Sequence, residues 1–459
     1  MNQPIQASLE AQRAEDADCK IPPLDPELLK RVEEEERENV RIGAIIQESN
    51  RVALEQLARE AKAAEEPSTE TCTGILDDYI EQDFESQYAE GHRLLLTTHL
   101  PLGPYGTALY DFLIDLDPAK MTYEDDDDDR SRTEVVFDYV PTAYIPNKQS
   151  VKENNYELNI EKLLAGSSDG GPVILLCQTK KNDRLPERVV MKVFDPMFYP
   201  WEYSLGEGPW RETARADMEL CCEAAAYETL HVGNCDGYPH LAPKYYGAFT
   251  IKLHTFNPDL KDKSRVVGAI LMEYIDGKTM GSQCEMDEDG ILMPRTFMPI
   301  FKSDKPGNWT RMERNDRLKI LAQLLDGIVS QMKAGVEPRF LNPEHVLLSE
   351  YRHPARPRER GQIRVTLIDY RKAVVDSKRK NPVNFYEKFS KPPHPYTRFS
   401  VKKLQGFAGW FPEEWMDDAP RMKRWLADSF GEVNGSNSRY SVRPDLDKPI
   451  EQLEAAKFI

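Results

Sequence analysis

The chain has 459 residues, of which 40% are hydrophobic and 30% charged, with a formal net charge of −18 and a pI of about 5.1. This length allows two or three domains with at least one full hydrophobic core. The acidic balance argues against nucleic-acid binding, which needs a basic face, and the lack of an eighteen-residue apolar run argues against a membrane span.

The cysteines and the N-terminal segment favour a soluble intracellular protein. The seven cysteines are scattered, no CxxC pair occurs, and Cys221 and Cys222 are adjacent on a predicted helix. This pattern is typical of a reducing compartment and gives no zinc signal. The polar, acidic N-terminus is unlike a secretory signal or a transit peptide. The basic run Lys378–Lys380 is too short to decide between cytoplasm and nucleus.

Residues 1–70 predict a disordered segment followed by a long helix over 27–66. Asp25 and Pro26 suit the start of a helix, and the run from Glu27 contains no proline before Pro67. Its apolar spacing is near helical but breaks at the charged stretch Glu33–Glu38. Two interpretations stay open: a solvated helix packed on its own domain, or a coiled-coil helix that binds a partner.

Residues 71–150 predict an acidic extension that is only partly folded. The run Glu124–Arg132 contains six consecutive acidic side chains, which repel one another and favour a solvated loop. A metal site or a contact for a basic partner is the alternative. The following sequence VVFDYVPTAYIP, residues 135–146, alternates enough to predict an edge strand.

From about Tyr156 the pattern predicts a strand, a glycine-rich turn, a strand, a polar turn and a third strand. The first turn contains Gly166, Gly170 and Gly171, whose backbone amides could cover phosphate groups or simply form a turn. Lys192 lies inside the apolar sequence RVVMKVF of the third strand. A buried lysine needs a partner for its charge, unless it lies at an edge and its amine reaches solvent.

The sequence RETARADMELCCEAAAYETLH then predicts a helix that could supply this partner. Glu223 lies beside its apolar face, with Tyr227 one turn later on the same side, and Glu228 is the competing candidate. Two more strands follow, over 240–254 and 264–277. The second ends in a connector that contains Glu273 and Tyr274.

Residues 281–459 predict a mainly helical part. An insertion-like loop spans 284–308, and a core helix begins near Glu313 and ends at Gly335. A strand with the sequence IRVTLIDY contains Asp369. Three tryptophans in the last fifty residues indicate packed helices rather than a tail: Trp410, Trp415 and Trp425.

The order of these motifs over residues 155–459 resembles the protein-kinase superfamily, and it is most similar to divergent kinase-like proteins of filamentous fungi. The C-terminal sequences HPYTRF, FAGWF and WLADSFG match motifs that recur in that family. The resemblance implies an α+β, two-lobed fold, with a β-rich N-lobe over 151–280 and a larger, mainly helical C-lobe over 281–459. ATP and Mg²⁺ are the cofactors that it implies.

Position by position, the resemblance gives roles to individual residues. Lys192 corresponds to the lysine that binds phosphates, Glu223 to its helix partner, and Asp369 to the magnesium ligand, within Asp-Tyr-Arg instead of Asp-Phe-Gly. The adenine-binding connector corresponds to Met272, Glu273 and Tyr274. Structural alternatives remain for these residues: a plain ion pair of Lys192 with Glu223, and a turn cap at Asp369.

The catalytic loop departs from the family pattern. In the sequence PRFLNPEHVLL, Pro338 replaces the histidine, Phe340 the catalytic aspartate and His345 the metal-binding asparagine. A catalytic carboxylate contributes about 10²–10⁴ in rate, and phenylalanine cannot replace it. Histidine is also a poor ligand for Mg²⁺, which prefers oxygen. Glu337 or Glu344 could act as a substitute base, although neither stands at the aspartate's position.

Three hypotheses follow. The first is a pseudokinase that binds ATP with Mg²⁺ and acts through a protein partner. The second is an active, atypical phosphotransferase that uses a base outside the usual loop and modifies a protein or a small molecule. The third is a structural, coiled-coil interaction protein with a vestigial cleft, in which the helix over 27–66 is the functional element.

Overall fold

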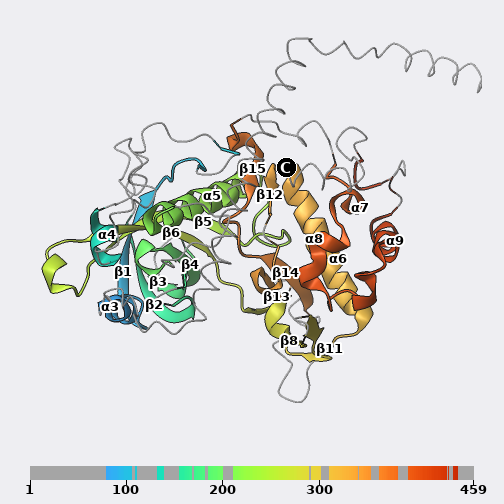
Figure 1. Ribbon diagram of the computed structural model, residues 1–459, viewed down its shortest axis with the longest axis horizontal. Coiled ribbons are helices and arrows are strands. Elements are labelled where there is room, and N and C mark those ends of the chain that lie inside the picture. The colour runs from blue at the N-terminus through green and yellow to red at the C-terminus, as the bar shows by residue number, and fades with distance from the viewer. Residues whose placement is uncertain are drawn as a thin grey trace, which may run out of the picture. The chain divides into compact units, whose positions relative to one another are not determined.

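The computed structural model describes residues 79–105, 109–110, 132–138, 155–167, 170–180, 185–199, 210–288, 291–300, 310–339, 341–352, 361–380, 391–431, 433 and 438–442. All of them belong to one compact unit, Thr71–Ile450 (Figure 1). The helix predicted over 27–66, residues 124–131 of the acidic run and Phe340 lie outside the described residues. No described helix has both the length and the apolar character that crossing a membrane requires.

A closed barrel of six antiparallel strands forms the first half of this unit, in the order β1–β2–β3–β4–β6–β5 (Figure 1). In chain order the strands are β1 (Arg93–His99), β2 (Asn155–Ala165), β3 (Val173–Thr179), β4 (Arg188–Phe194), β5 (Tyr245–Leu253) and β6 (Arg265–Glu273). Alternate residues of β4, namely Val189, Met191 and Val193, fill the barrel interior, as the two-residue period of a strand requires. The predicted strands from β2 to β6 are confirmed.

Strand β1 lies within residues 71–150, the range predicted as an acidic, partly folded extension. It pairs with β2 on one side and with β5 on the other, so it closes the barrel. Leu94 and Leu96 are buried inside, whereas Leu95 between them is 61% exposed. The sequence alone does not show this alternation, because the outward-facing Leu95 is as apolar as the two leucines that face inward.

Two short helices join the barrel outside its strands, α3 (Tyr79–Gln87) and α4 (Arg132–Asp138). Helix α4 corrects the edge strand predicted at 135–146 over residues 135–138; residues 139–146 lie outside the described residues. Val135, Val136 and Phe137 are all buried, and α4 packs beside the 3-10 helix η4 (Pro196–Phe198). Three consecutive buried residues do not fit an edge strand, which exposes alternate side chains. Tertiary packing therefore overrides the β-propensity of these residues.

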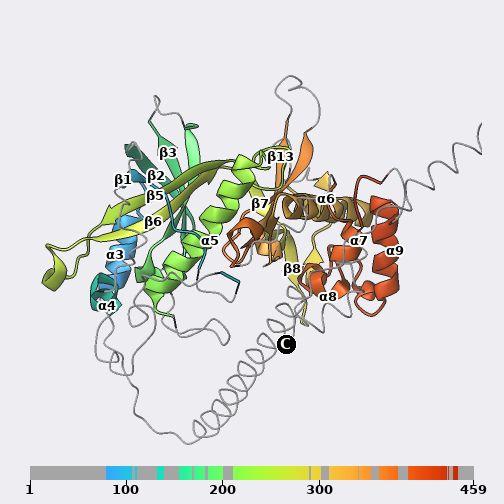
Figure 2. The same ribbon diagram turned by 90° about the horizontal axis from the view of Figure 1, so that it is seen from above.

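Helix α5 (Glu212–Val232) packs against the outside of the barrel and also reaches the second half of the unit (Figure 2). It contacts β4, β5 and β6 of the barrel, and β12 (Val336–Glu337) and β15 (Val374–Val375) beyond it. Its buried face includes Leu220, Ala224, Tyr227 and Leu230 at helical spacing. One continuous core therefore runs from the barrel's outer face into the second half.

Helix α6 (Arg314–Lys333) is the centre of the second half and confirms the predicted core helix. A capping box of Glu313 and Asp316 begins it, and Gly335 follows its end with a φ of +85°. A small sheet of β14 (Gln362–Leu367), β13 (Val346–Tyr351) and β7 (Gly277–Thr279) lies near it. Further short 3-10 helices are η5 (Pro258–Leu260), η6 (Gly281–Gln283), η7 (Pro343–His345) and η8 (Asp376–Lys378).

The described residues of the insertion predicted as a loop at 284–308 include short paired strands. Strand β8 (Cys284–Met286) pairs with β9 (Leu292–Pro294), and β10 (Phe297–Met298) pairs with β11 (Thr310–Arg311). A Cβ added at Gly409 would clash with the carbonyl oxygen of Leu292. Close packing on the C-terminal segment, which the local sequence does not indicate, therefore orders this region.

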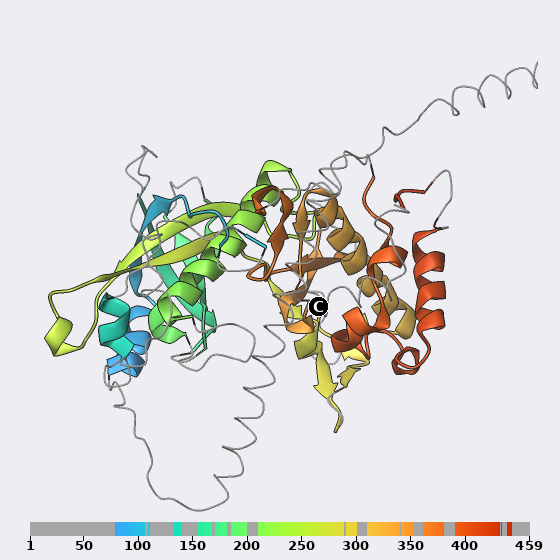
Figure 3. The same cartoon turned by 45° about the horizontal axis from the view of Figure 1, so that its top comes forward.

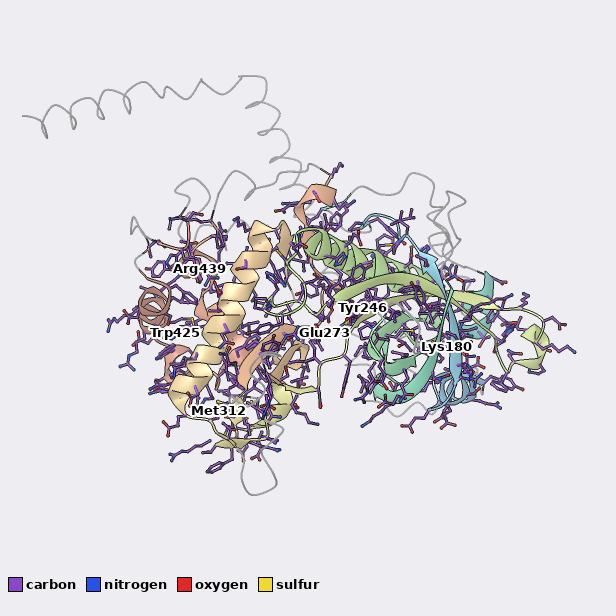
Figure 4. All side chains as sticks on the ribbon, turned by 180° about the vertical axis from the view of Figure 1, so that it is seen from behind. Lys180, Tyr246, Glu273, Met312, Trp425 and Arg439 are labelled. Carbon is purple, nitrogen blue, oxygen red and sulfur yellow. The ribbon has the colours of Figure 1, made fainter. Side chains whose placement is uncertain are left out.

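Packed helices end the described chain, as the tryptophans predict. They are α7 (Pro395–Arg398), α8 (Val401–Leu404), η9 (Gln405–Phe407), η10 (Glu413–Trp415) and α9 (Ala419–Phe430). Trp410 is fully buried, and the rings of Trp415 and Trp425 are 5.7 Å apart between centroids. Figure 4 shows Trp425 on this helical half, far from Lys180 on the barrel.

A buried polar network fastens α3 to the barrel. The guanidinium of Arg265 on β6, 1% exposed, lies 2.8 Å from the Asp195 carboxylate and donates to Gln87 Oε1 over 2.6 Å. The hydroxyl of Tyr88 donates to the same aspartate over 2.9 Å. Asp83 accepts hydrogen bonds from the backbone and side chain of the 255–256 segment. Each buried charge in the network thus has partners, which its burial requires.

Replacing Arg265 by methionine should destabilise the protein strongly. The variant keeps an apolar stem but leaves the buried Asp195 carboxylate without its cation, a loss of about 3–5 kcal/mol. Urea unfolding followed by circular dichroism measures the change. Lys263→Met, on the same side of the barrel and 56% exposed, is the control and should change the free energy of unfolding by less than about 0.5 kcal/mol. Equal effects of the two substitutions would contradict the role of the network.

Candidate functional site

Strand β4 presents Lys192 to the space between the barrel and helix α5. Val190 and Phe194, two residues before and after it, pack with α5 rather than inside the barrel. Lys192 shares their side of the strand because side chains alternate between the two faces. Its side chain is only 6% exposed, so its charge needs a partner within the protein.

Glu223 of α5 is this partner. Its Oε2 lies 2.5 Å from Nζ of Lys192, and its side chain is fully buried. Glu223 lies on the same helix face as Tyr227 and Leu230, whereas the competing candidate Glu228 is exposed. The structure therefore brings together the lysine and the first of the two glutamates that the sequence singles out.

Asp369, which follows strand β14, completes a cluster of charges. Its Oδ1 lies 3.5 Å from Nζ of Lys192, and its Oδ2 lies 3.4 Å from Nε2 of His345. The backbone N–H of Tyr370 donates to Oε1 of Glu223 over 3.4 Å. Three segments that are distant in the sequence, in β4, in α5 and after β14, thus converge at one point.

Arg371 is the site residue that sequence reasoning missed. Its Nε lies 3.1 Å from each oxygen of Asp369, and its Nη2 lies 2.8 Å from Oδ2. Its Nη1 is 3.4 Å from Oε2 of Glu219 on α5. The one signal in the sequence is an arginine two residues after the aspartate, where the family pattern has glycine.

The cluster shifts the pKa values of its two carboxyl groups in opposite directions. Burial raises the pKa of Asp369, but Lys192, Arg371 and His345 together outweigh it and hold the pKa well below its usual range. Burial raises the pKa of Glu223 to about 7, and the nearby charge of Asp369 adds to the rise, although Lys192 opposes it. Asp369 is therefore ionised at neutral pH, whereas Glu223 titrates near it.

The rings of three tyrosines pack against one another in a stack beside the cluster. The ring of Tyr227 lies parallel to that of Tyr245 at 5.7 Å and edge-on to that of Tyr370 at 4.9 Å between centroids. The Tyr370 hydroxyl accepts a hydrogen bond from Gln331 of α6 over 2.6 Å. The stack thus links the barrel, α5, the Asp369 segment and α6.

A cavity of about 910 Å³ opens beside the cluster. Lys192, His345, Asp369 and Arg371 all line it, and the segment from Met272 to Gly277 forms another wall. This volume lies within the range of small-molecule sites in proteins. Figure 3 shows the chain passing from the barrel to the helical half, and Figure 4 labels Glu273, one of the residues of this wall.

Two of the three predicted glycines line the cavity, and the third does not. Gly166 and Gly170 line the cavity, beside strands β2 and β3. Gly171 does not line it, and its backbone N–H donates to the carbonyl of Phe198 over 2.7 Å. Gly166 and Gly171 both have a positive φ, of +115° and +87°, which favours glycine there. A turn role is therefore sufficient for Gly171.

The three connector residues line the cavity but differ in their contacts. Met272 is buried, and its sulfur lies 3.7 Å from the Tyr227 hydroxyl. The carboxylate of Glu273 forms a double ion pair with Arg364, at 2.7 and 2.9 Å. Tyr274 lies under the guanidinium of Arg188, 4.5 Å from the ring centroid. The Glu273 side chain thus fixes the connector.

The segment PRFLNPEHVLL, residues 338–348, contributes His345 and Glu344 to the cavity. Glu344 accepts a hydrogen bond from the Thr279 hydroxyl over 2.6 Å. Pro338 is buried, and Glu337 belongs to β12, where it pairs with β15 and does not line the cavity. Of the two proposed substitute bases, only Glu344 is therefore at the cavity.

Comparisons with known proteins give matches among solved structures alone. No family model and no curated protein matches the chain. Among solved structures it is similar to the kinase domain of PknI from Mycobacterium tuberculosis, at 13% identity and a TM-score of 0.29, over 59% of this chain and 87% of that domain. For a double mutant of PknI the identity is 14% and the TM-score 0.25, over 47% and 60%. TM-scores below 0.5 do not establish a common fold.

The free energy of unfolding should depend on pH through Glu223. The folded state binds more protons than the unfolded state between about pH 4.5 and 7, because the pKa rises from 4.5 to about 7 on folding. The stabilising contribution of Glu223 is therefore full below pH 4.5 and is lost as the pH rises through 7. Asp369 does not titrate in this window, since its pKa is lowered.

Glu223→Gln isolates this effect from the other titrating groups. We expect the unfolding free energy of the wild type, minus that of the variant, to fall between pH 5 and pH 8. Urea unfolding of both proteins at several pH values measures this difference. A difference that stays constant would show that Glu223 keeps an ordinary pKa, and one that rises would show that folding lowers its pKa; either result would contradict the prediction.

Proposed function

We propose that the chain is a two-lobed, protein-kinase-like protein whose cleft binds a nucleotide and whose catalytic loop lacks the groups for efficient phosphate transfer. The barrel with α5 would be the N-lobe, and the part that contains α6 to α9 the C-lobe. The observation that carries the proposal is the Lys192–Glu223 ion pair at 2.5 Å, with Asp369 3.5 Å from the lysine, at a cavity of about 910 Å³.

The lining of the cavity suits a nucleotide. Met272 to Tyr274 form a wall next to the barrel, where the edge of a base could meet the backbone. Gly166 and Gly170 line the cavity beside strands β2 and β3, where they present backbone without a side chain. Lys192 is the buried cation that would bind phosphate groups. Glu223 would orient this lysine, since their ion pair fixes Nζ at the cavity wall.

The cleft lacks the side chains that efficient phosphate transfer requires. The sequence places Pro338 and Phe340 where a histidine and a catalytic aspartate would orient the attacking hydroxyl. We therefore propose that the protein acts as a pseudokinase, which binds a protein partner inside the cell. Cytoplasm and nucleus both remain compatible with this proposal.

An atypical phosphotransferase is a second candidate, and one observation favours it. Glu344 lines the same cavity as Lys192 and Asp369, so a carboxylate is available there. Its side chain already accepts a hydrogen bond from Thr279, however, and a Cβ at Gly281 would clash with its Oε1. The carboxylate is thus packed against η6 and would have to move to accept a proton from a substrate.

ATP at about ten times its Kd should raise the melting temperature of the full chain by about 2–5 °C, because a ligand that binds only the folded state stabilises it. Lys192→Met should abolish the shift. Lys180→Met is the matched control: its amine is on the barrel but 59% exposed, paired with Glu157, and away from the cavity. No shift of the wild type at millimolar ATP, with and without Mg²⁺, would refute the nucleotide site.

A phosphate-transfer assay separates the two candidates. With radiolabelled ATP and generic protein acceptors, we expect the wild type to transfer no more phosphate than Lys192→Met. A rate at least tenfold above that variant, lost in Glu344→Gln but kept in Glu337→Gln, would replace the pseudokinase proposal by the phosphotransferase. Glu337 serves as control because it is outside the cavity.

A further inference from the structure

The surroundings of Asp369 do not suit a magnesium ion. Oδ1 receives the backbone N–H of Arg371 at 3.0 Å and Nε at 3.1 Å, and Oδ2 receives Nη2 at 2.8 Å. The further neighbours are also positive or hydrogen-bond donors, Lys192 Nζ at 3.5 Å and His345 Nε2 at 3.4 Å. Mg²⁺ needs oxygen ligands in octahedral geometry, and here a guanidinium occupies both oxygens of the carboxylate.

A second oxygen ligand is missing from the position where the family pattern has one. His345 stands at the metal-binding asparagine of the catalytic loop and offers nitrogen instead. The expectation that Asp369 binds Mg²⁺ therefore disagrees with the residues around it.

We propose that this cleft binds the phosphate groups of a nucleotide without a divalent metal ion, with the Arg371 guanidinium supplying the positive charge beside Asp369. The inference rests on the proposed nucleotide-binding function of the same cavity. It adds a binding residue, Arg371, and predicts which form of the nucleotide is bound: the free anion as readily as its magnesium complex.

The geometry of Arg371 suits this role. Asp369 and Glu219 hold its guanidinium from two sides, so the group is fixed before a ligand arrives. A guanidinium has five N–H donors, and these contacts engage Nε and one N–H each of Nη1 and Nη2. The side chain lines the cavity and is 25% exposed, so the other donors can reach a phosphate oxygen.

The charges of the cluster favour this arrangement over a metal. Lys192 and Arg371 line the cavity with two positively charged side chains, whereas Glu219 and Glu223, two of the three carboxylates that they contact, do not line it. A divalent ion would have to enter next to both cations and displace the guanidinium from its carboxylate. A phosphate group meets attraction at the same place.

Calorimetric titration of the full chain with ATP tests the proposal, once in MgCl₂ and once in EDTA. We expect the two Kd values to agree within about threefold. Arg371→Gln should weaken binding in EDTA about tenfold, the effect of losing one charge-assisted hydrogen bond. The matched control is Arg314→Gln, because Arg314 is half exposed, pairs with Glu414 and lies outside the cavity. This control should bind like the wild type.

Binding that occurs only with Mg²⁺ would overturn the inference and leave the proposed nucleotide-binding function intact. Binding in neither buffer would overturn both. If Arg371→Gln does not fold, the ratio of the two wild-type Kd values decides alone. The double variant Arg371→Gly with His345→Asn is a further test: it frees Asp369 and provides an oxygen ligand, so its affinity should become at least tenfold higher with Mg²⁺ than in EDTA.

Discussion

The burial of Lys192 is the constraint around which the rest of the structure is arranged. An ammonium group that is almost inaccessible to water needs nearby carboxylates, and two of them, Glu223 and Asp369, come from segments more than thirty and more than one hundred and seventy residues away. The ion pair with Glu223 holds α5 against β4, and the ion pair with Asp369 holds the segment after β14 against the same place. The charged cluster is therefore a product of the complete fold, and local unfolding of any of the three segments would dismantle it.

Aromatic and ionic contacts hold the same segments by independent means. The stack of Tyr227, Tyr245 and Tyr370 runs beside the charged cluster and reaches α6 through Gln331. On the far side of the barrel, the Arg265 network fixes α3 without contacting the cavity. Salt screens exposed charges but hardly affects buried pairs and ring contacts, so the geometry of the site depends little on ionic strength.

The periodic spacing of apolar residues was sufficient to predict most helices and strands and part of the site. Strands β2 to β6 and helices α5 and α6 follow from apolar spacing, and Glu223 follows from the helix face that Tyr227 marks. The local sequence could not reveal β1, whose partners are about sixty and one hundred and fifty residues away, or α4, which forms by packing on η4. Nor could it reveal that Arg371 folds back on Asp369, since spacing alone does not fix a side-chain rotamer.

The closure of the barrel by β1 limits how this protein can associate with others. A strand at an open edge offers unpaired N–H and C=O groups, to which a foreign strand can add by backbone hydrogen bonds regardless of its side chains. Because β1 pairs on both sides, the barrel has no such edge. Strand addition and edge-to-edge aggregation are thus unavailable to it, and any recognition at the barrel has to be selective for side chains such as the outward-facing Leu95.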